Sequence, residues 1–205
     1  MIFDTALTNW EINESYKERN LYYKIFAGYL FNEFIEVYEE RKTNFLSLLE
    51  SCIKKSERFF GDAHEAYLII KEMKGSQLHV TFDYHPAQIF EEYKKENRGE
   101  MSDILLHSNS HMISIECKFL SNISFKKDIE AVHERINKFS KHFKIKPLQV
   151  LLLKEKKWNY TKLIKEELKK NPSVPVVVLF WEDLRSLITN ENVLQYLNTQ
   201  IDRIV

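Results

Sequence analysis

Three residues that could support metal-dependent chemistry lie in one short segment, SDILLHSNSHMISIECKFL, residues 102–120. Asp103 begins one apolar run, and Glu116 and Lys118 stand two residues apart in the next. The Glu-x-Lys spacing alone carries little information, because it recurs in helical or polar charged segments at Glu40/Lys42, Glu72/Lys74, Glu92/Lys94, Glu155/Lys157 and Glu167/Lys169. Only Glu116 and Lys118 lie in an apolar strand pattern that follows another strand beginning with an acid.

The register of the two predicted strands decides whether the acids meet. If Asp103 pairs with Glu116, Ile104 faces Ile115, and Asp103, Glu116 and Lys118 share the opposite face of the sheet. A shift of one residue would spoil every apolar cross-strand pair. The pattern therefore predicts a register in which the two carboxylates are neighbours, with Cβ atoms about 5 Å apart.

Two adjacent carboxylates repel one another unless one is protonated or a cation lies between them. Oxygen ligands without a nearby thiolate or imidazole suit Mg²⁺, which keeps several of its waters. An ammonium on the same face, such as that of Lys118, can orient a water or stabilise charge on a phosphate. This combination of groups is typical of phosphodiester hydrolysis. The alternative is an amphipathic hairpin whose charged residues form a solvated face, with an ion pair worth under about 1 kcal/mol.

The elements that position these residues follow from the periodicity of the chain. Apolar residues at helical spacing predict helices from about 13 to 60, with a break at Thr43 and Asn44. Asp62 and Gly75 bracket a third helix, 62–75. The remaining pattern gives, in order, strand 77–84, a short helix 86–96, strands 103–107 and 112–119, helix 125–140, strand 148–153, helix 160–170, strand 174–181 and short helices to the end. The class is α/β with a mixed sheet.

Composition narrows the class of protein further. The 205 residues carry 30 Lys+Arg and 30 Asp+Glu, so no net charge draws the chain onto nucleic acid or an anionic membrane, and such binding would need a local patch. The two cysteines, Cys52 and Cys117, belong to no Cys/His cluster, which argues against a zinc site or a disulfide framework. No basic segment leads into an apolar one near Asp4, and the run VPVVVLFW is too short to span a bilayer, so we expect a cytoplasmic protein.

At Asp103 and the triplet Glu116, Cys117 and Lys118, the chain resembles the PD-(D/E)xK nuclease superfamily, the restriction-endonuclease-like fold. The core of that fold runs helix, three strands, helix, strand, and the segments across 62–153 repeat this order. The resemblance implies a mixed β-sheet flanked by helices in a nuclease-like domain, 61–205. An N-terminal helical extension, 1–60, would precede it as a dimerisation element.

The resemblance also implies roles for individual residues. Asp103, Glu116 and the Cys117 backbone carbonyl would bind Mg²⁺ or Mn²⁺, and Lys118 would be catalytic. The proline of the motif is Ser102 here, a position that varies freely in the superfamily. Family members often add a glutamate from the first helix, and both Glu65 and Glu100 are candidates for it.

Basic residues after the triplet, Lys126, Lys127 and Arg135, are candidate contacts to nucleic-acid phosphates, although a basic helix end is commonly just solvated. His107 and His111 flank the hairpin turn and are expected to be exposed there, and His133 is a weaker candidate acid. The aromatic residues of the N-terminal helices are expected to form core or a dimer surface; they are Tyr22, Tyr23, Phe26, Tyr29, Phe31 and Phe34.

The favoured function is a Mg²⁺-dependent endonuclease acting on DNA in restriction, repair or antiphage defence, acting as a homodimer or with a protein partner. The alternative is an inactive scaffold of the same fold that binds nucleic acid or a protein partner. The intact set of acid, acid and lysine favours the enzyme, because carboxylates packed together without use destabilise a fold.

Overall fold

The computed structural model of the chain describes residues 21, 23–31, 36–84, 102–118, 129–154, 162–169 and 172–202. The elements in chain order are η2 (Tyr23–Leu30), α3 (Tyr38–Ile53), β1 (Phe59–Phe60), α4 (Ala63–Lys74), β2 (His79–Tyr84), β3 (Ser102–His107), β4 (His111–Lys118), α6 (Ala131–Phe143), β5 (Lys146–Leu153), α7 (Lys162–Leu168), β6 (Val176–Phe180), η5 (Trp181–Leu187) and α8 (Glu191–Asp202). Among these helices, none is long and apolar enough to cross a membrane.

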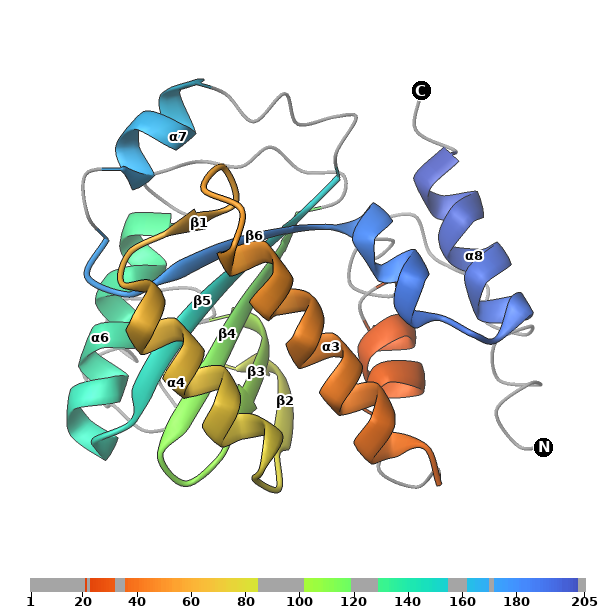
Figure 1. Ribbon diagram of the computed structural model, residues 1–205, viewed down its shortest axis with the longest axis horizontal. Coiled ribbons are helices and arrows are strands. Elements are labelled where there is room, and N and C mark those ends of the chain that lie inside the picture. Colours follow the sequence, from red (N-terminus) through yellow and green to blue (C-terminus); the bar gives the residue numbers. More distant parts are fainter. Residues whose placement is uncertain are drawn as a thin grey trace.

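The strands form one six-stranded mixed sheet in the order β1-β6-β5-β4-β3-β2 (Figure 1). Strands β2, β3 and β4 are successively antiparallel, whereas β4, β5 and β6 run parallel. The two-residue strand β1 pairs antiparallel with β6 at the far edge. Helix α6 makes the crossover from β4 to its parallel neighbour β5, as a parallel pair requires. The predicted α/β class with a mixed sheet is confirmed.

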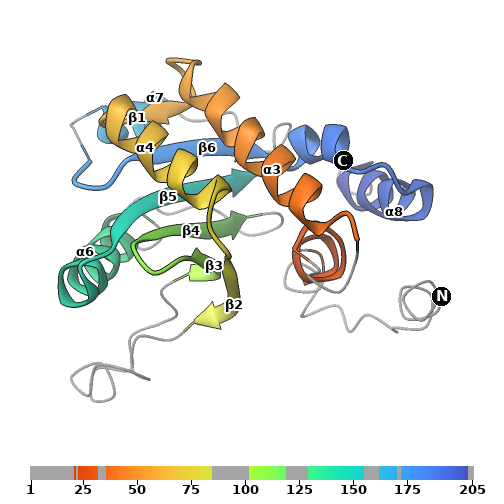
Figure 2. The same ribbon diagram turned by 60° about the horizontal axis from the view of Figure 1, so that its bottom comes forward.

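Helices cover both faces of this sheet (Figure 2). On one face the largest core cluster joins side chains of β3, β4, β5 and β6 to η2, α3, α4, η5 and α8. On the other face, α6 packs Val132, Ile136 and Phe139 against Leu105 and Met112. A further cluster there joins α7 to β5 and β6. The apolar alternation along β3 and β4 therefore serves two cores, and both faces of the central strands are shielded from water.

The N-terminal helices belong to the main core of the sheet. Phe26 meets Phe45 of α3 and Trp181 of η5 edge to face, with ring centroids 5.6 and 6.3 Å apart. All three side chains are completely buried, and Tyr29 and Phe31 are buried as well. For these aromatic residues the expectation of a core role is confirmed. Since α3 and the sheet share one core, the boundary placed at residue 60 does not separate two independently packed units.

The break predicted at Thr43 and Asn44 is wrong, because both residues lie inside α3. Their side chains are exposed, while Phe45, Leu46 and Leu49 face the core at helical spacing. A helix propensity penalty of well under about 1 kcal/mol per residue is small beside that burial.

The predicted third helix is confirmed as α4. The side chain of Asp62 accepts a hydrogen bond from the Glu65 N–H at 3.0 Å, which caps the first turn. Gly75 follows the last turn, but with φ −84° it has ordinary right-handed backbone rather than a left-handed cap. The predicted helix 86–96 lies outside the described residues. The helical segment predicted to reach residue 60 ends at Ile53 instead, and Phe59–Phe60 form strand β1. The other predicted strands and helices are found where the structure describes them, within a few residues at the described ends.

Candidate active site

The register of β3 and β4 is the one that the apolar pattern predicts. Ile104 pairs with Ile115 and Leu106 with Ile113, and these side chains are completely buried in the main core. Extended by one residue, the same register sets Asp103 opposite Glu116. Because the side chains of a strand alternate, both acids point to the other face of the sheet, which α6 covers.

Asp103 also closes the β3–β4 ladder. Its Oδ2 accepts a hydrogen bond from the Cys117 backbone N–H at 2.6 Å. In an antiparallel pair the hydrogen-bonded positions alternate, and Ser108 donates to the His111 carbonyl at 2.9 Å. Counting two residues at a time from Ser108 and His111 along the ladder makes Ser102 and Cys117 the last hydrogen-bonded pair at the other end. The carboxylate of Asp103 thus takes the N–H that this rung of the ladder would use.

Glu116 and Lys118 form an ion pair on the same face. The distance between Lys118 Nζ and Glu116 Oε1 is 2.7 Å, and the two side chains are 15% and 11% exposed. Positions two apart on a strand point the same way, which is why the Glu-x-Lys spacing brings these groups together in β4. A pair that is this shielded from water holds its partners more firmly than a surface pair does.

These groups fit a hard divalent cation. Asp103 and Glu116 supply carboxylate oxygens. The Cys117 carbonyl points to the β3 side, since the N–H and C=O of a strand residue face the same neighbour. The described residues hold no cluster of three or more His, Cys, Asp or Glu side chains. Such a site would therefore combine two carboxylates and one carbonyl with water, a ligand set that suits Mg²⁺ better than Zn²⁺.

The structure does not bring Glu65 to this site. Glu65 lies in the first turn of α4, and α4 packs on the opposite face of the sheet. The start of α4 follows directly after β1, which pairs with β6 at the far edge. Glu65 is thus separated from Asp103 both by the sheet and along it, and the placement of a metal ligand there is wrong. The competing residue, Glu100, lies outside the described residues.

Of the three candidate phosphate contacts, the structure describes Arg135. It is a half-buried residue of α6, next in sequence to the fully buried Ile136. Helix α6 covers the face that carries Asp103 and Glu116, so Arg135 lies on the right side of the sheet for the predicted role. Lys126 and Lys127 lie outside the described residues, as do both segments that adjoin the site, 85–101 and 119–128.

A polar layer beside the acids was missed in the sequence. Ser114 and Gln149 pair across β4 and β5, both completely buried, two residues before Glu116 and Leu151. His133 of α6 lies beside this layer, and burial lowers its pKa to about 4, which outweighs the opposing effect of the neighbouring Gln149 side chain. The available signal is one polar residue in each of two apolar runs, Ser114 in MISI and Gln149 in LQVLLL.

The histidines of the hairpin are less exposed than expected. His111 is buried, because its side chain lies on the same face of β4 as Ile113, the face that α4 covers. Its Nδ1 lies 2.8 Å from the Ser110 hydroxyl. Burial lowers the pKa of His111. His107 is half-buried and faces His79 across β2 and β3. The expectation that His107 and His111 are exposed turn residues is wrong, most clearly for His111.

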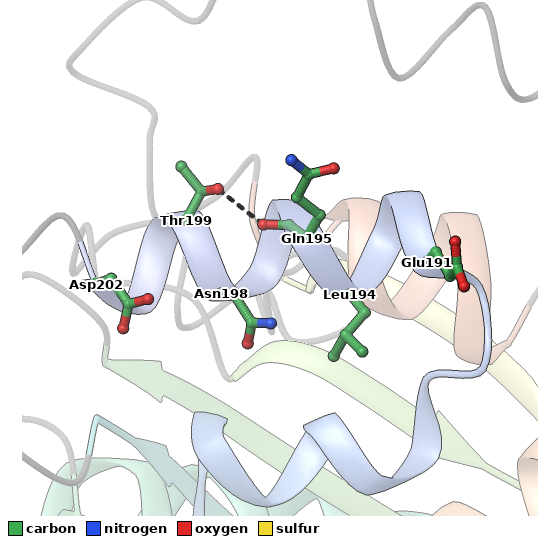
Figure 3. A pocket seen from close by; sticks show the side chains of 6 residues that line it. All are labelled: Glu191, Leu194, Gln195, Asn198, Thr199 and Asp202. Atoms are coloured by element: carbon green, nitrogen blue, oxygen red, sulfur yellow. Dashed lines mark hydrogen bonds between the residues drawn. The ribbon is translucent and has the colours of Figure 1, made fainter.

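Three hollows that the described residues line lie away from Asp103 and Glu116. One of about 630 Å³ runs along α8 and is lined by Glu191, Leu194, Gln195, Asn198, Thr199 and Asp202 (Figure 3). Others of about 460 and 200 Å³ lie between the start of α3 and the turn after α4, and beside β1. Helix α8 packs on the face of the sheet away from Asp103 and Glu116. These hollows carry no group of carboxylates and lysine comparable to the β3–β4 site.

Comparison of the chain with family models, with curated proteins and with solved structures found no match. An inference about function must therefore come from the residues of this chain and their geometry.

Proposed function

We propose that this chain is a Mg²⁺-dependent nuclease with a restriction-endonuclease-like fold. One observation carries the proposal: Asp103, Glu116 and Lys118 lie on one face, at the same end of adjacent strands. Asp103 is bound to the Cys117 N–H at 2.6 Å, and Lys118 to Glu116 at 2.7 Å. A solvated charged face, the alternative interpretation, agrees poorly with side chains that are 11% and 15% exposed.

The topology supports the same assignment. The elements from α4 to β5 follow the order helix, three strands, helix, strand. Strands β2, β3 and β4 are an antiparallel meander, and β5 returns parallel to β4 after α6. The acids thus fall early in the second strand and late in the third strand of this unit, as in the superfamily that the motif resembles. A fold of this kind still leaves the reaction to be tested.

Each residue has a definite task in the proposed reaction. Asp103 and Glu116 would hold the cation together with the Cys117 carbonyl. When bound, a divalent cation supplies positive charge and Lewis acidity to the phosphate and its attacking water. Lys118 holds the Glu116 carboxylate in place and presents an ammonium to charge that develops on the phosphate oxygens. The bond from Cys117 fixes Asp103, so that the carboxylates need little rearrangement before the reaction.

The finer assignments belong to the same proposal. We infer a DNA substrate and a role in restriction, repair or antiphage defence inside the cytoplasm. Since the chain has no net charge, phosphate contacts must be local, and Arg135 on α6 is the described candidate. A second copy of the chain would supply the second active site for a cut through both strands.

A cleavage assay tests the proposal. Purified protein is incubated with supercoiled plasmid, single-stranded DNA or RNA, in Mg²⁺, Mn²⁺ or EDTA. We expect the wild type to cut at least one substrate, EDTA to stop it, and Glu116→Ala and Lys118→Ala to be inactive. Glu72→Ala is the matched control, because Glu72 and Lys74 have the same spacing on the surface of α4. A folded wild type inert on all substrates, or cleavage that survives in Glu116→Ala, would refute the assignment and favour the inactive scaffold.

A further inference from the structure

Two histidines face one another across the β2–β3 pair, away from the acidic site. His79 in β2 is the direct cross-strand partner of His107 in β3. The centroids of their imidazole rings are 5.3 Å apart, with the ring planes inclined by 33°. Directly paired strand residues point to the same side of the sheet, so both rings share one surface. A regular β-ladder therefore fixes the separation of two strong metal ligands.

The ring separation suits a shared metal ion. Two imidazoles that bind one tetrahedral ion through nitrogens at about 2.0–2.1 Å have their ring centroids about 5 Å apart. The observed 5.3 Å matches this without movement of the backbone. The terminal side-chain torsion is broad for histidine, so rotation of the exposed His79 ring can turn one of its nitrogens toward the His107 ring.

The pair is accessible from one side. His79 is exposed, which leaves a route for an ion from solvent, whereas His107 is half-buried. Burial and the neighbouring His79 both lower the pKa of His107. A hydrogen bond from the His107 ring to the Ser108 backbone acts in the opposite direction. Such a bond at one nitrogen fixes the ring and leaves the other nitrogen as a ligand.

We propose that His79 and His107 form a two-histidine site for a divalent transition metal ion, Zn²⁺ or Cu²⁺, with water completing the coordination. Imidazole prefers these ions to Mg²⁺, so the site differs in metal chemistry from the carboxylates of Asp103 and Glu116. Asp103 and His107 lie on the same face of β3 but four residues apart, which is about 13 Å. One ion cannot bridge the two sites. An ion at the histidine pair would link the edge strand β2 to β3.

Isothermal titration calorimetry, in which Zn²⁺ is added to EDTA-stripped protein, tests the site. We expect one histidine-dependent binding event in the wild type, weakened about a hundredfold in His79→Asn and in His107→Asn, since each loses one of two linked ligands. His64→Asn is the matched control, because His64 is exposed on α4. Glu116→Gln should retain the event, which separates it from binding at the acids.

Two further measurements make the test independent of one variant. With Cu²⁺, electron paramagnetic resonance should show hyperfine coupling to two imidazole nitrogens, reduced to one in His79→Asn. Zn²⁺ should also raise the thermal unfolding temperature of the wild type and of His64→Asn, but not of His79→Asn. Because His79 is exposed on an edge strand, its variant decides the matter even if His107→Asn fails to fold. Zn²⁺ binding that is absent, or unchanged in His79→Asn, would overturn the proposal.

Discussion

The Cys117 N–H donates to Asp103 Oδ2 at 2.6 Å, where the β3–β4 ladder would otherwise make its next backbone bond. A side chain thus completes the sheet at the point where the two strands carry their acids. Asp103 has two tasks in consequence, since it satisfies a buried backbone donor and holds a carboxylate beside Glu116. The two tasks can be separated by substitution, because only the second requires a charge.

Asp103→Asn should therefore fold and yet be inactive. The amide oxygen of Asn can accept the bond from Cys117, whereas the neutral side chain is a poor ligand for a hard cation. We expect cleavage to fall about a hundredfold or more, with little change in the free energy of unfolding. Asp103→Leu leaves the buried N–H unsatisfied and should be less stable than Asp103→Asn by about 1–3 kcal/mol. Urea unfolding of both variants checks this, and equal stabilities would contradict the role of Asp103 in the ladder.

Lys118→Met should lose cleavage without losing the cation. The methionine side chain replaces the apolar stem of the lysine, while the ammonium that holds Glu116 at 2.7 Å is removed. The Glu116 carboxylate then no longer forms an ion pair with the ammonium, so the affinity for Mn²⁺ should be unchanged or higher. Glu116→Gln should instead weaken Mn²⁺ binding. Parallel Mn²⁺ titrations of the two variants check this. A loss of affinity in Lys118→Met equal to that in Glu116→Gln would show that the lysine supports the site in another way.

Stability should fall with acid because His133 is largely shielded from water. Its pKa is about 4 in the folded chain against 6.5 when unperturbed, so between these values only the unfolded chain binds the proton. Stability is therefore complete above the unfolded pKa and decreases as the pH falls toward 4. Between about pH 7 and about pH 5 the loss is about 2 kcal/mol. Urea unfolding of wild type and His133→Gln at both pH values measures it. If the variant keeps the same pH dependence, His133 does not cause it.

A substitution in α3 should destabilise the sheet as well as the helix. Phe45 is completely buried between Phe26 and the core of the sheet, and its replacement by Ala should cost about 3–5 kcal/mol. Trp10 and Trp158 are first replaced by Phe, so that buried Trp181 is the remaining tryptophan. Far-ultraviolet circular dichroism and Trp181 fluorescence should then report one coincident transition. Thr43→Ala, at an exposed position of α3, should change stability by under about 0.5 kcal/mol. Loss of helical signal before any change at Trp181 would instead indicate a separate N-terminal unit.

The register of the central hairpin could be predicted because period-two alternation leaves one acceptable pairing for Ile104, Leu106, Ile113 and Ile115. The hydrogen bond from the Cys117 N–H to Asp103 could not be predicted, since a contact between one backbone group and one side chain has no periodic pattern. The two-residue strand β1 is too short to produce such a pattern either.

The errors concern packing between elements. The apolar stripe of α4 is clear in the sequence, but the face of the sheet that it covers is not, so the sequence places Glu65 on the wrong side. The low helix propensity of Thr43 and Asn44 predicts a break because propensity is a local property, whereas the burial of Phe45 and Leu49 depends on the whole fold. The position of His111 beside the turn predicts exposure, whereas its side chain is buried on the face of β4 that α4 covers, and local sequence does not show that packing.

Mn²⁺ binding to the wild type, Asp103→Asn and Glu116→Gln tests the central claim most directly, with Glu72→Gln as the control of equal charge change. Free Mn²⁺ measured by electron paramagnetic resonance reports the metal whether or not a substrate has been found. The account predicts a site in the wild type and in Glu72→Gln that each active-site substitution weakens strongly. A folded wild type that binds no Mn²⁺, or a site unaffected by both substitutions, would contradict it and leave Asp103, Glu116 and Lys118 with a structural role alone.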